Sequence, residues 1–127
     1  MEEIEVVRNS ELKAGYSTLG IVREKAFESI HRYVIVSKTT IASGEVSDWH
    51  HHGKRHLYGF LESGRMRLEY GAKGASAVDV GKRDFFHIPL HLVHRDVNPD
   101  KEQRVVVVNI LVGRGDPVIN VKKPKQD

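Results

Sequence analysis

Residues 44–64 read GEVSDWHHHGKRHLYGFLESG, and this stretch indicates both the fold class and the chemistry of the chain. It contains a His-x-His-x3-His array made by His50, His52 and His56. Residues two apart on a strand project from the same face, so His50 and His52 can reach one ion while His51 points away. Imidazole nitrogens are the commonest protein ligands of borderline divalent metals. The stretch therefore predicts part of a metal site on a β-strand.

A second piece of the site lies at residues 89–98, PLHLVHRDVN, which contain His94. Together the two pieces resemble the paired motifs of the cupin superfamily: a Gly, His-x-His, a Glu and a Gly, followed by Pro-x-Gly-x-x-His-x3-Asn. A two-part signal of this kind is far more specific than a lone His-x-His. The resemblance covers approximately residues 20–121. It implies an all-β fold, a small antiparallel β-barrel or double-stranded β-helix of the jelly-roll type.

The chain departs from the common cupin pattern at two positions. His56 stands where most cupins have a glutamate, so the resemblance is to single-domain, RmlC-like cupins with four histidines around the metal. It implies one divalent ion, manganese, iron, zinc or nickel, held by His50, His52, His56 and His94. His91 replaces the usual glycine of the second motif, and His87 and His91 are expected at most to support the site or contact a substrate.

Short apolar or alternating runs between turn residues are typical of an all-β barrel or sandwich. The first thirty residues favour strand and turn over helix. Strands are expected at residues 33–41, 46–52, 56–61, 65–70, 76–80, 85–89, 93–98 and 104–112. Alternation continued from His56 would place Tyr58 and Phe60 inside the barrel, where the Tyr58 hydroxyl is a catalytic candidate. Arg95 should face away from the site.

Three acidic residues near the motifs, Asp48, Glu62 and Asp96, are candidates for hydrogen bonds to a ligand imidazole. Solvated loop acids are the commoner interpretation of such residues.

Composition limits the remaining function classes. The chain has 127 residues, which suits one domain (1–127), with a basic tail at 122–127. There is no cysteine, which excludes disulfides and thiolate ligands. The net charge is +3, but basic residues cluster only in the tail, so nucleic-acid binding is not expected. No apolar stretch suits a signal peptide or a membrane span, so a cytoplasmic protein is expected.

The run 104–112 is apolar on both faces, which is unusual for a barrel strand whose outer face meets solvent. We therefore expect a homodimer that covers this strand or the sheet around it. The resemblance implies a metal-binding protein that acts on a small organic molecule, with oxygenase or dioxygenase chemistry as the expected function. The alternatives are a non-redox isomerase or lyase reaction and a binding or sensory role without catalysis.

Overall fold

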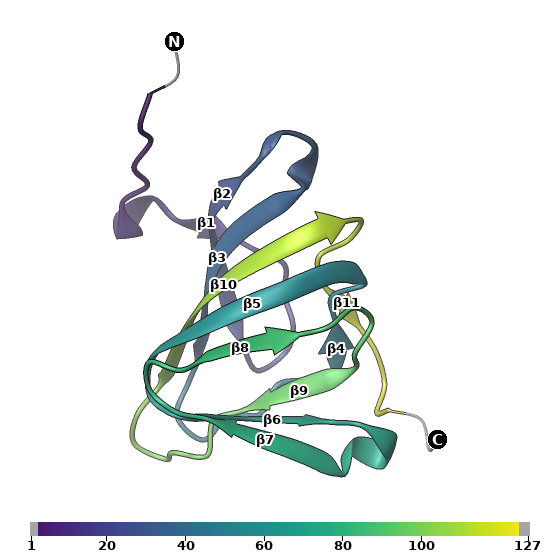
Figure 1. Cartoon of the computed structure of the whole chain (residues 1–127). Coiled ribbons are helices and arrows are strands. Elements are labelled where there is room, and N and C mark those ends of the chain that lie inside the picture. The colour runs from purple at the N-terminus through teal and green to yellow at the C-terminus, as the bar shows by residue number, and fades with distance from the viewer. Residues whose placement is uncertain (1–2, 125–127) are drawn as a thin grey trace.

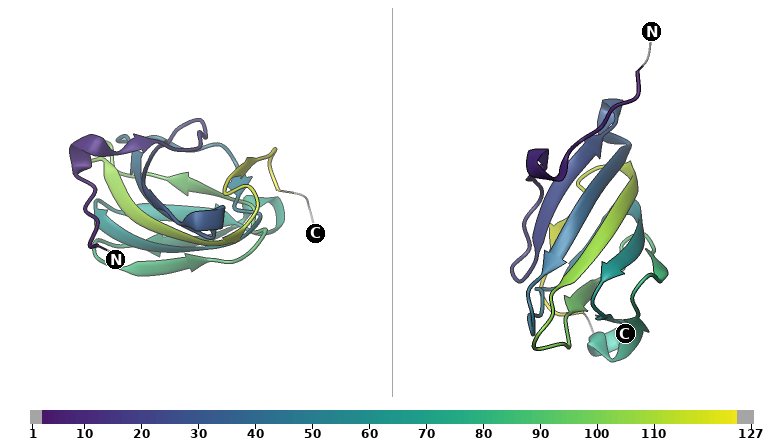
Figure 2. Two further views of the ribbon diagram at one scale, coloured as in Figure 1. Left: turned by 90° about the horizontal axis from the view of Figure 1, so that it is seen from above. Right: turned by 90° about the vertical axis from the view of Figure 1, so that its left-hand side faces the viewer.

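The computed structural model describes residues 3–124, which fold into two antiparallel β-sheets that curve around a common interior (Figures 1 and 2). In this part of the chain the strands are β1 (Lys13–Ala14), β2 (Val22–Glu28), β3 (Val34–Ile41), β4 (His50–His51), β5 (Lys54–Ser63), β6 (Met66–Tyr70), β7 (Ser76–Val80), β8 (Phe85–Ile88), β9 (His94–Val97), β10 (Val105–Arg114) and β11 (Ile119–Asn120). The short 3-10 helices are η1 (Asn9–Glu11), η2 (Ile30–Arg32) and η3 (Ala72–Gly74). Within residues 3–124 no helix is long and apolar enough to cross a membrane.

One sheet has the order β1-β2-β3-β10-β5-β8 and the other β11-β4-β9-β6-β7. The predicted all-β fold is confirmed, and most of the expected strands appear within a residue or two of their predicted bounds. The exception is the run expected at 46–52, which is reduced to β4. Before β4, Val46 forms only an isolated bridge to Val97, and Asp48 donates its backbone N–H to Leu19. The last part of the expected basic tail, residues 125–127 with Lys125, lies outside the described residues.

The barrel interior contains both apolar and polar side chains. On β3 every second residue points inward, and this row runs Ile35, Ser37, Thr39, Ile41. Ile41, with Leu61 of β5 and Val105 of β10, has no exposed surface. The complete buried apolar cluster consists of Ile21, Ile35, Ile41, Leu57, Leu61, Met66, Leu68, Val80, Ile88, Val105, Val107 and Leu111. Burial of this apolar surface is the main stabilising contribution to such a barrel.

The inward alternation expected along β5 is wrong by one residue. Arg55, Leu57, Gly59 and Leu61 face the interior, whereas Tyr58 is 48% exposed. The cause is the turn after His52, where Gly53 adopts a φ of +58° and the chain enters β5 one position out of step.

Arg55 faces inward because its charge is satisfied by backbone carbonyls near the end of the barrel. It donates from Nε to the oxygen of Gly115 at 2.9 Å and from Nη2 to that of Arg32 at 2.7 Å. A buried guanidinium needs such acceptors, since an unpaired buried charge is strongly destabilising. These bonds stabilise the orientation of β5 that the turn at Gly53 produces.

Because Gly59 of β5 has no side chain, the aromatic ring of Phe86 on the neighbouring strand β8 can lie against it. Gly59 pairs with Phe86 of β8, and a Cβ at position 59 would overlap the Phe86 ring. Phe86 packs against the buried apolar cluster from this position. The missing side chain of Gly59 is thus part of the packing.

We predict that Gly59→Ala lowers the free energy of unfolding by about 2 kcal/mol, because overpacking forces Phe86 to move. Urea unfolding of the wild type and the variant measures this change. A Phe86→Leu background provides the control: the cost of Gly59→Ala should fall there, since the smaller side chain leaves room. Equal costs in both backgrounds would contradict the role given to the ring.

Candidate metal centre

Three of the four predicted ligands meet in the barrel interior. His50 lies on β4 and pairs in register with His94 of β9, and His52 directly follows β4. All three side chains are buried, and their ligand nitrogens lie within 4.8 Å of one another. The ring centroids of His50 and His94 are 4.3 Å apart, and those of His52 and His94 are 5.1 Å apart. This is the only group of three or more such ligands within the described residues.

Backbone carbonyls set the tautomer of each imidazole. Nδ1 of His50 lies 2.8 Å from the carbonyl oxygen of Asp48, and Nδ1 of His94 lies 2.9 Å from that of Leu92. Nδ1 of His52 lies 2.9 Å from the carbonyl oxygen of Pro117. A carbonyl oxygen only accepts, so each Nδ1 carries the hydrogen and each Nε2 keeps its lone pair.

The free nitrogens point to a missing partner. Nε2 of His52 and of His94 are buried, and neither has a hydrogen-bond partner among residues 3–124. An unsatisfied buried polar atom is costly and needs an explanation. A histidine that binds a metal through one ring nitrogen usually donates a hydrogen bond from its other ring nitrogen, often to a backbone carbonyl. The donor set therefore fits a divalent metal ion.

Burial also keeps the imidazoles of His50 and His52 neutral, which metal binding requires. Desolvation lowers the pKa of His50 and of His52 well below the ordinary value of 6.5. The charge that His94 would carry lowers both pKa values further. At neutral pH both histidines can bind an ion without first releasing a proton.

The structure does not bring His56 to this group. His56 lies on the outer face of β5, with its Nδ1 2.8 Å from Nε2 of the exposed His87. Tyr58 stacks on His87 at the same surface, with centroids 4.9 Å apart. The position facing the cavity on β5 is instead taken by Leu57. His91 is exposed, with a φ of +57°.

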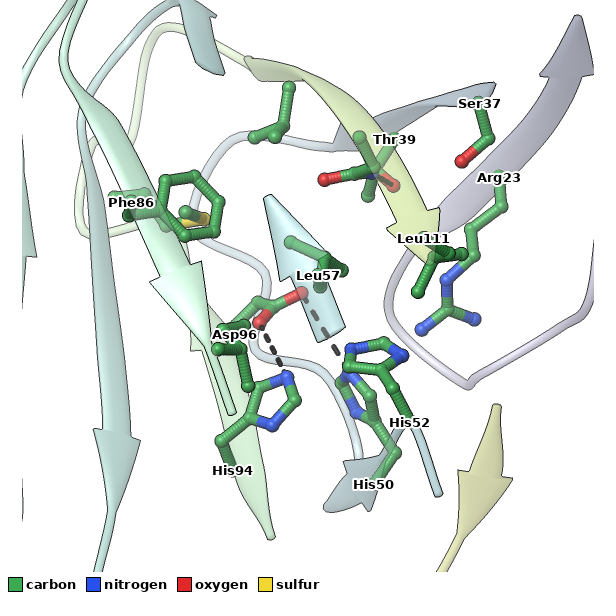
Figure 3. A pocket seen from close by; sticks show the side chains of 14 residues that line it. Arg23, Ser37, Thr39, His50, His52, Leu57, Phe86, His94, Asp96 and Leu111 are labelled. Carbon is green, nitrogen blue, oxygen red and sulfur yellow. Dashed lines mark hydrogen bonds and ion pairs between the residues drawn. The ribbon is translucent and has the colours of Figure 1, made fainter. Parts of the chain in front are cut away.

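Asp96 lies at the site, although its sequence context favoured a solvated acid. Its carboxylate oxygens are 3.7 Å from Nε2 of His94 and 4.0 Å from Nε2 of His50 (Figure 3). The signal available in the sequence was the spacing, because Asp96 is two residues beyond His94 and so shares its face of β9. Glu62 is exposed, and Asp48 contributes only its backbone oxygen.

The histidines line one side of a cavity, and polar residues from the other sheet line the opposite side (Figure 3). The cavity volume is about 20 Å³, room for about one ion or water molecule. Its complete lining is Arg23, Ser37, Thr39, His50, His52, Leu57, Met66, Phe86, Ile88, His94, Asp96, Val107, Asn109 and Leu111. Of these, Arg23 could not be assigned from the sequence, because no motif includes it.

The fold and the site together define a class: a double-stranded β-helix with a candidate histidine metal centre in its interior. The sequence profile of the Cupin domain matches residues 37–111, so the chain belongs to the cupin family. No protein with a curated description matches the sequence significantly.

Solved structures share this fold at low sequence identity. KdgF from Halomonas sp. is 19% identical with a TM-score of 0.69, over 90% of this chain and 97% of that one. An uncharacterised conserved protein with a double-stranded β-helix domain from Klebsiella pneumoniae is 15% identical with a TM-score of 0.73, over 95% and 100%. Oxalate decarboxylase from Bacillus subtilis, described with Mn(II) centres, is 15% identical with a TM-score of 0.68, over 83% and 29%.

We predict that the metal-free protein loses stability as the pH falls below about 6.5. The folded state keeps His50 and His52 neutral, whereas the unfolded chain protonates them near pH 6.5, so protons favour unfolding. Each histidine contributes up to about 1.4 kcal/mol per pH unit below that value. Urea unfolding with a chelator at pH 8 to 5 measures the slope, which should be shallower in His52→Asn. A free energy of unfolding that stays constant between pH 7 and pH 5 would contradict the neutral state of His50 and His52 in the folded protein.

Proposed function

We propose that this protein is a metal-dependent cupin enzyme that acts on a small organic molecule. The observation that carries the proposal is the set of three buried imidazoles, each fixed through Nδ1 with its Nε2 turned to a common space. In this proposal His50, His52 and His94 hold one divalent ion. A purely structural role for the three histidines would leave the buried Nε2 atoms of His52 and His94 unexplained.

Asp96 serves as the fourth ligand in this proposal, in place of the His56 expected from the sequence. Ligand atoms that bind one ion at about 2.1 Å lie about 3 to 4 Å apart. The distances from the Asp96 oxygens to Nε2 of His94 and His50, 3.7 and 4.0 Å, agree with this range, whereas only the three histidines have ligand atoms that all lie within 4.8 Å of one another. Its negative charge also compensates part of the charge of the ion, which neutral imidazoles cannot do.

The reaction class that we propose is oxygenase chemistry. Three histidines and one carboxylate would leave two open positions on a six-coordinate ion, where dioxygen and a substrate could bind side by side. Bound iron or manganese would supply dioxygen chemistry, whereas zinc or nickel would supply Lewis-acid chemistry for an isomerase or lyase. The Mn(II) centres of the Bacillus subtilis decarboxylase support a redox-active ion in this fold. Oxygen consumption by iron- or manganese-loaded protein with a panel of small organic acids tests the assignment.

We predict that His52→Ala lowers metal affinity by at least about 100-fold, since loss of even a supporting group costs 10- to 100-fold. Elemental analysis and calorimetric titration of tag-free protein measure occupancy and affinity. His56→Ala is the matched control and should bind metal like the wild type. Loss of metal in His56→Ala, with retention in His52→Ala, would overturn the proposed ligand set.

We further propose that the protein is a homodimer formed through the outer face of β5, β8 and β10. Ile110 and Tyr58 are 41% and 48% exposed there, and Phe85 is 80% exposed. The middle of this face carries no Asp, Glu, Lys or Arg, so two copies can meet across a twofold axis without like-charge repulsion. Large exposed apolar patches commonly mark protein contacts.

We predict that light scattering gives twice the chain mass of 14.4 kDa for the wild type. Ile110→Lys should give the monomer mass, because it places a charge within the apolar contact. Val22→Lys is the control, since Val22 is 61% exposed on a different strand. A wild-type protein of monomer mass would contradict the dimer.

A further inference from the structure

The cavity wall that faces the histidines contains a buried cation. Arg23 of β2 is only 8% exposed, and Figure 3 shows its guanidinium directed toward the space beside His52. Desolvation lowers its pKa to about 10, while the charge of Asp96 acts in the opposite direction. Arg23 therefore remains positively charged at neutral pH. Burying a charge is costly unless it is paired and hydrogen-bonded, so a buried charge without a carboxylate partner marks a candidate functional group.

The contacts of Arg23 use only one end of its guanidinium. Nη1 donates to the carbonyl oxygen of Tyr16 at 3.1 Å and to Oγ1 of Thr18 at 2.8 Å. Among residues 3–124, Nε and Nη2 have no hydrogen-bond acceptor, and no carboxylate forms an ion pair with the side chain. The rest of this planar donor group is available to an oxyanion.

A second group on the same wall also lacks a partner. Ser37 is 6% exposed, and its Oγ is buried without a hydrogen-bond partner in the described part of the chain. Ser37 and Arg23 both line the metal cavity and a neighbouring cavity of about 220 Å³. That larger cavity is also lined by Tyr16, Ile35, Pro117 and Val118, and by Lys25 and Glu28, whose opposite charges form an ion pair at 3.1 Å. Donors that have no partner thus face two adjoining spaces.

We propose that Arg23 and Ser37 bind the carboxylate of a small organic acid, which is the substrate or ligand of the metal centre. This inference rests on the proposed function. A divalent ion, Arg23 and Asp96 together carry a net positive charge, which a bound anion would compensate. The guanidinium fork suits a carboxylate, and the Ser37 hydroxyl adds a third donor. The ion fills the cavity of about 20 Å³, so the organic acid occupies the adjoining cavity of about 220 Å³, which Arg23 and Ser37 also line.

Arg23 lies outside residues 37–111, which match the Cupin domain, whereas Ser37 is the first matched residue. The anion-binding role is therefore assigned from the geometry of this chain. In this role Arg23 selects and positions the substrate, and the ligands of the ion remain the three histidines and Asp96.

The test compares binding of glycolate with that of its uncharged amide, glycolamide, by calorimetric titration of metal-free and metal-loaded protein. The wild type should prefer glycolate, and Arg23→Gln should lower glycolate affinity about 10- to 100-fold with little effect on glycolamide, as expected for a lost charge-assisted hydrogen bond. Arg67→Gln, which removes the same charge from the exposed outer side of β6, is the matched control. It should behave like the wild type.

Two further variants keep the proposal testable if Arg23→Gln does not fold. Arg23→Lys keeps the charge and should retain part of the preference for glycolate, and Ser37→Ala, which leaves no group unpaired, should weaken glycolate about 3- to 10-fold. An unchanged ratio of glycolate to glycolamide affinity in these variants would overturn the role of Arg23 and Ser37. A separate metal titration of the same samples distinguishes this result from failure of the proposed function, which would appear as a wild-type protein that binds no metal.

Discussion

The arrangement of the site depends on three hydrogen bonds from histidine Nδ1 to backbone carbonyls. The acceptors for His50 and His94 lie two residues earlier in the chain, so these bonds form within the local segment. The acceptor for His52 is Pro117, in the loop after β10, 65 residues away. The same loop accepts from Arg55 through Gly115. One loop therefore supports both the third imidazole and the inward side chain of Arg55, and rigid support of this kind keeps ligand atoms where an ion can bind.

The interior combines two regions with different energetics. Residues such as Ile41, Leu61 and Val105 stabilise the fold by burial alone. The polar region contains Arg23 and Ser37, and burying these groups costs free energy that their contacts within residues 3–124 only partly offset. Natural proteins retain such costs mainly at functional sites. The contrast between the two regions supports a ligand-binding interior over a purely structural barrel core.

Much of the fold follows from sequence pattern. The alternation of Met66 and Leu68 with charged residues correctly predicts which face of β6 is buried, and the run of β-branched residues predicts β3. The strand expected at 46–52 is mostly irregular: Ser47 donates its backbone N–H to Asp96 and Asp48 donates to Leu19, so successive residues bond to two different segments and no continuous ladder forms. Alternation fails along β5, where the single left-handed residue Gly53 reverses the inward and outward positions that follow.

The sequence by itself determined the all-β class. It also determined that His50 and His52 lie on the same face, because side chains two residues apart on an extended segment share a face whatever surrounds them. It also indicated that His94 belongs with them, through the second motif. Only the tertiary structure decided that Asp96, Arg23 and Ser37 line the same cavity and that His56 lies on the outer surface. These placements depend on which strands pair and on the conformation of one turn. Such contacts join residues far apart in the chain, and apart from the spacing of Asp96 two residues beyond His94 no local spacing indicates them.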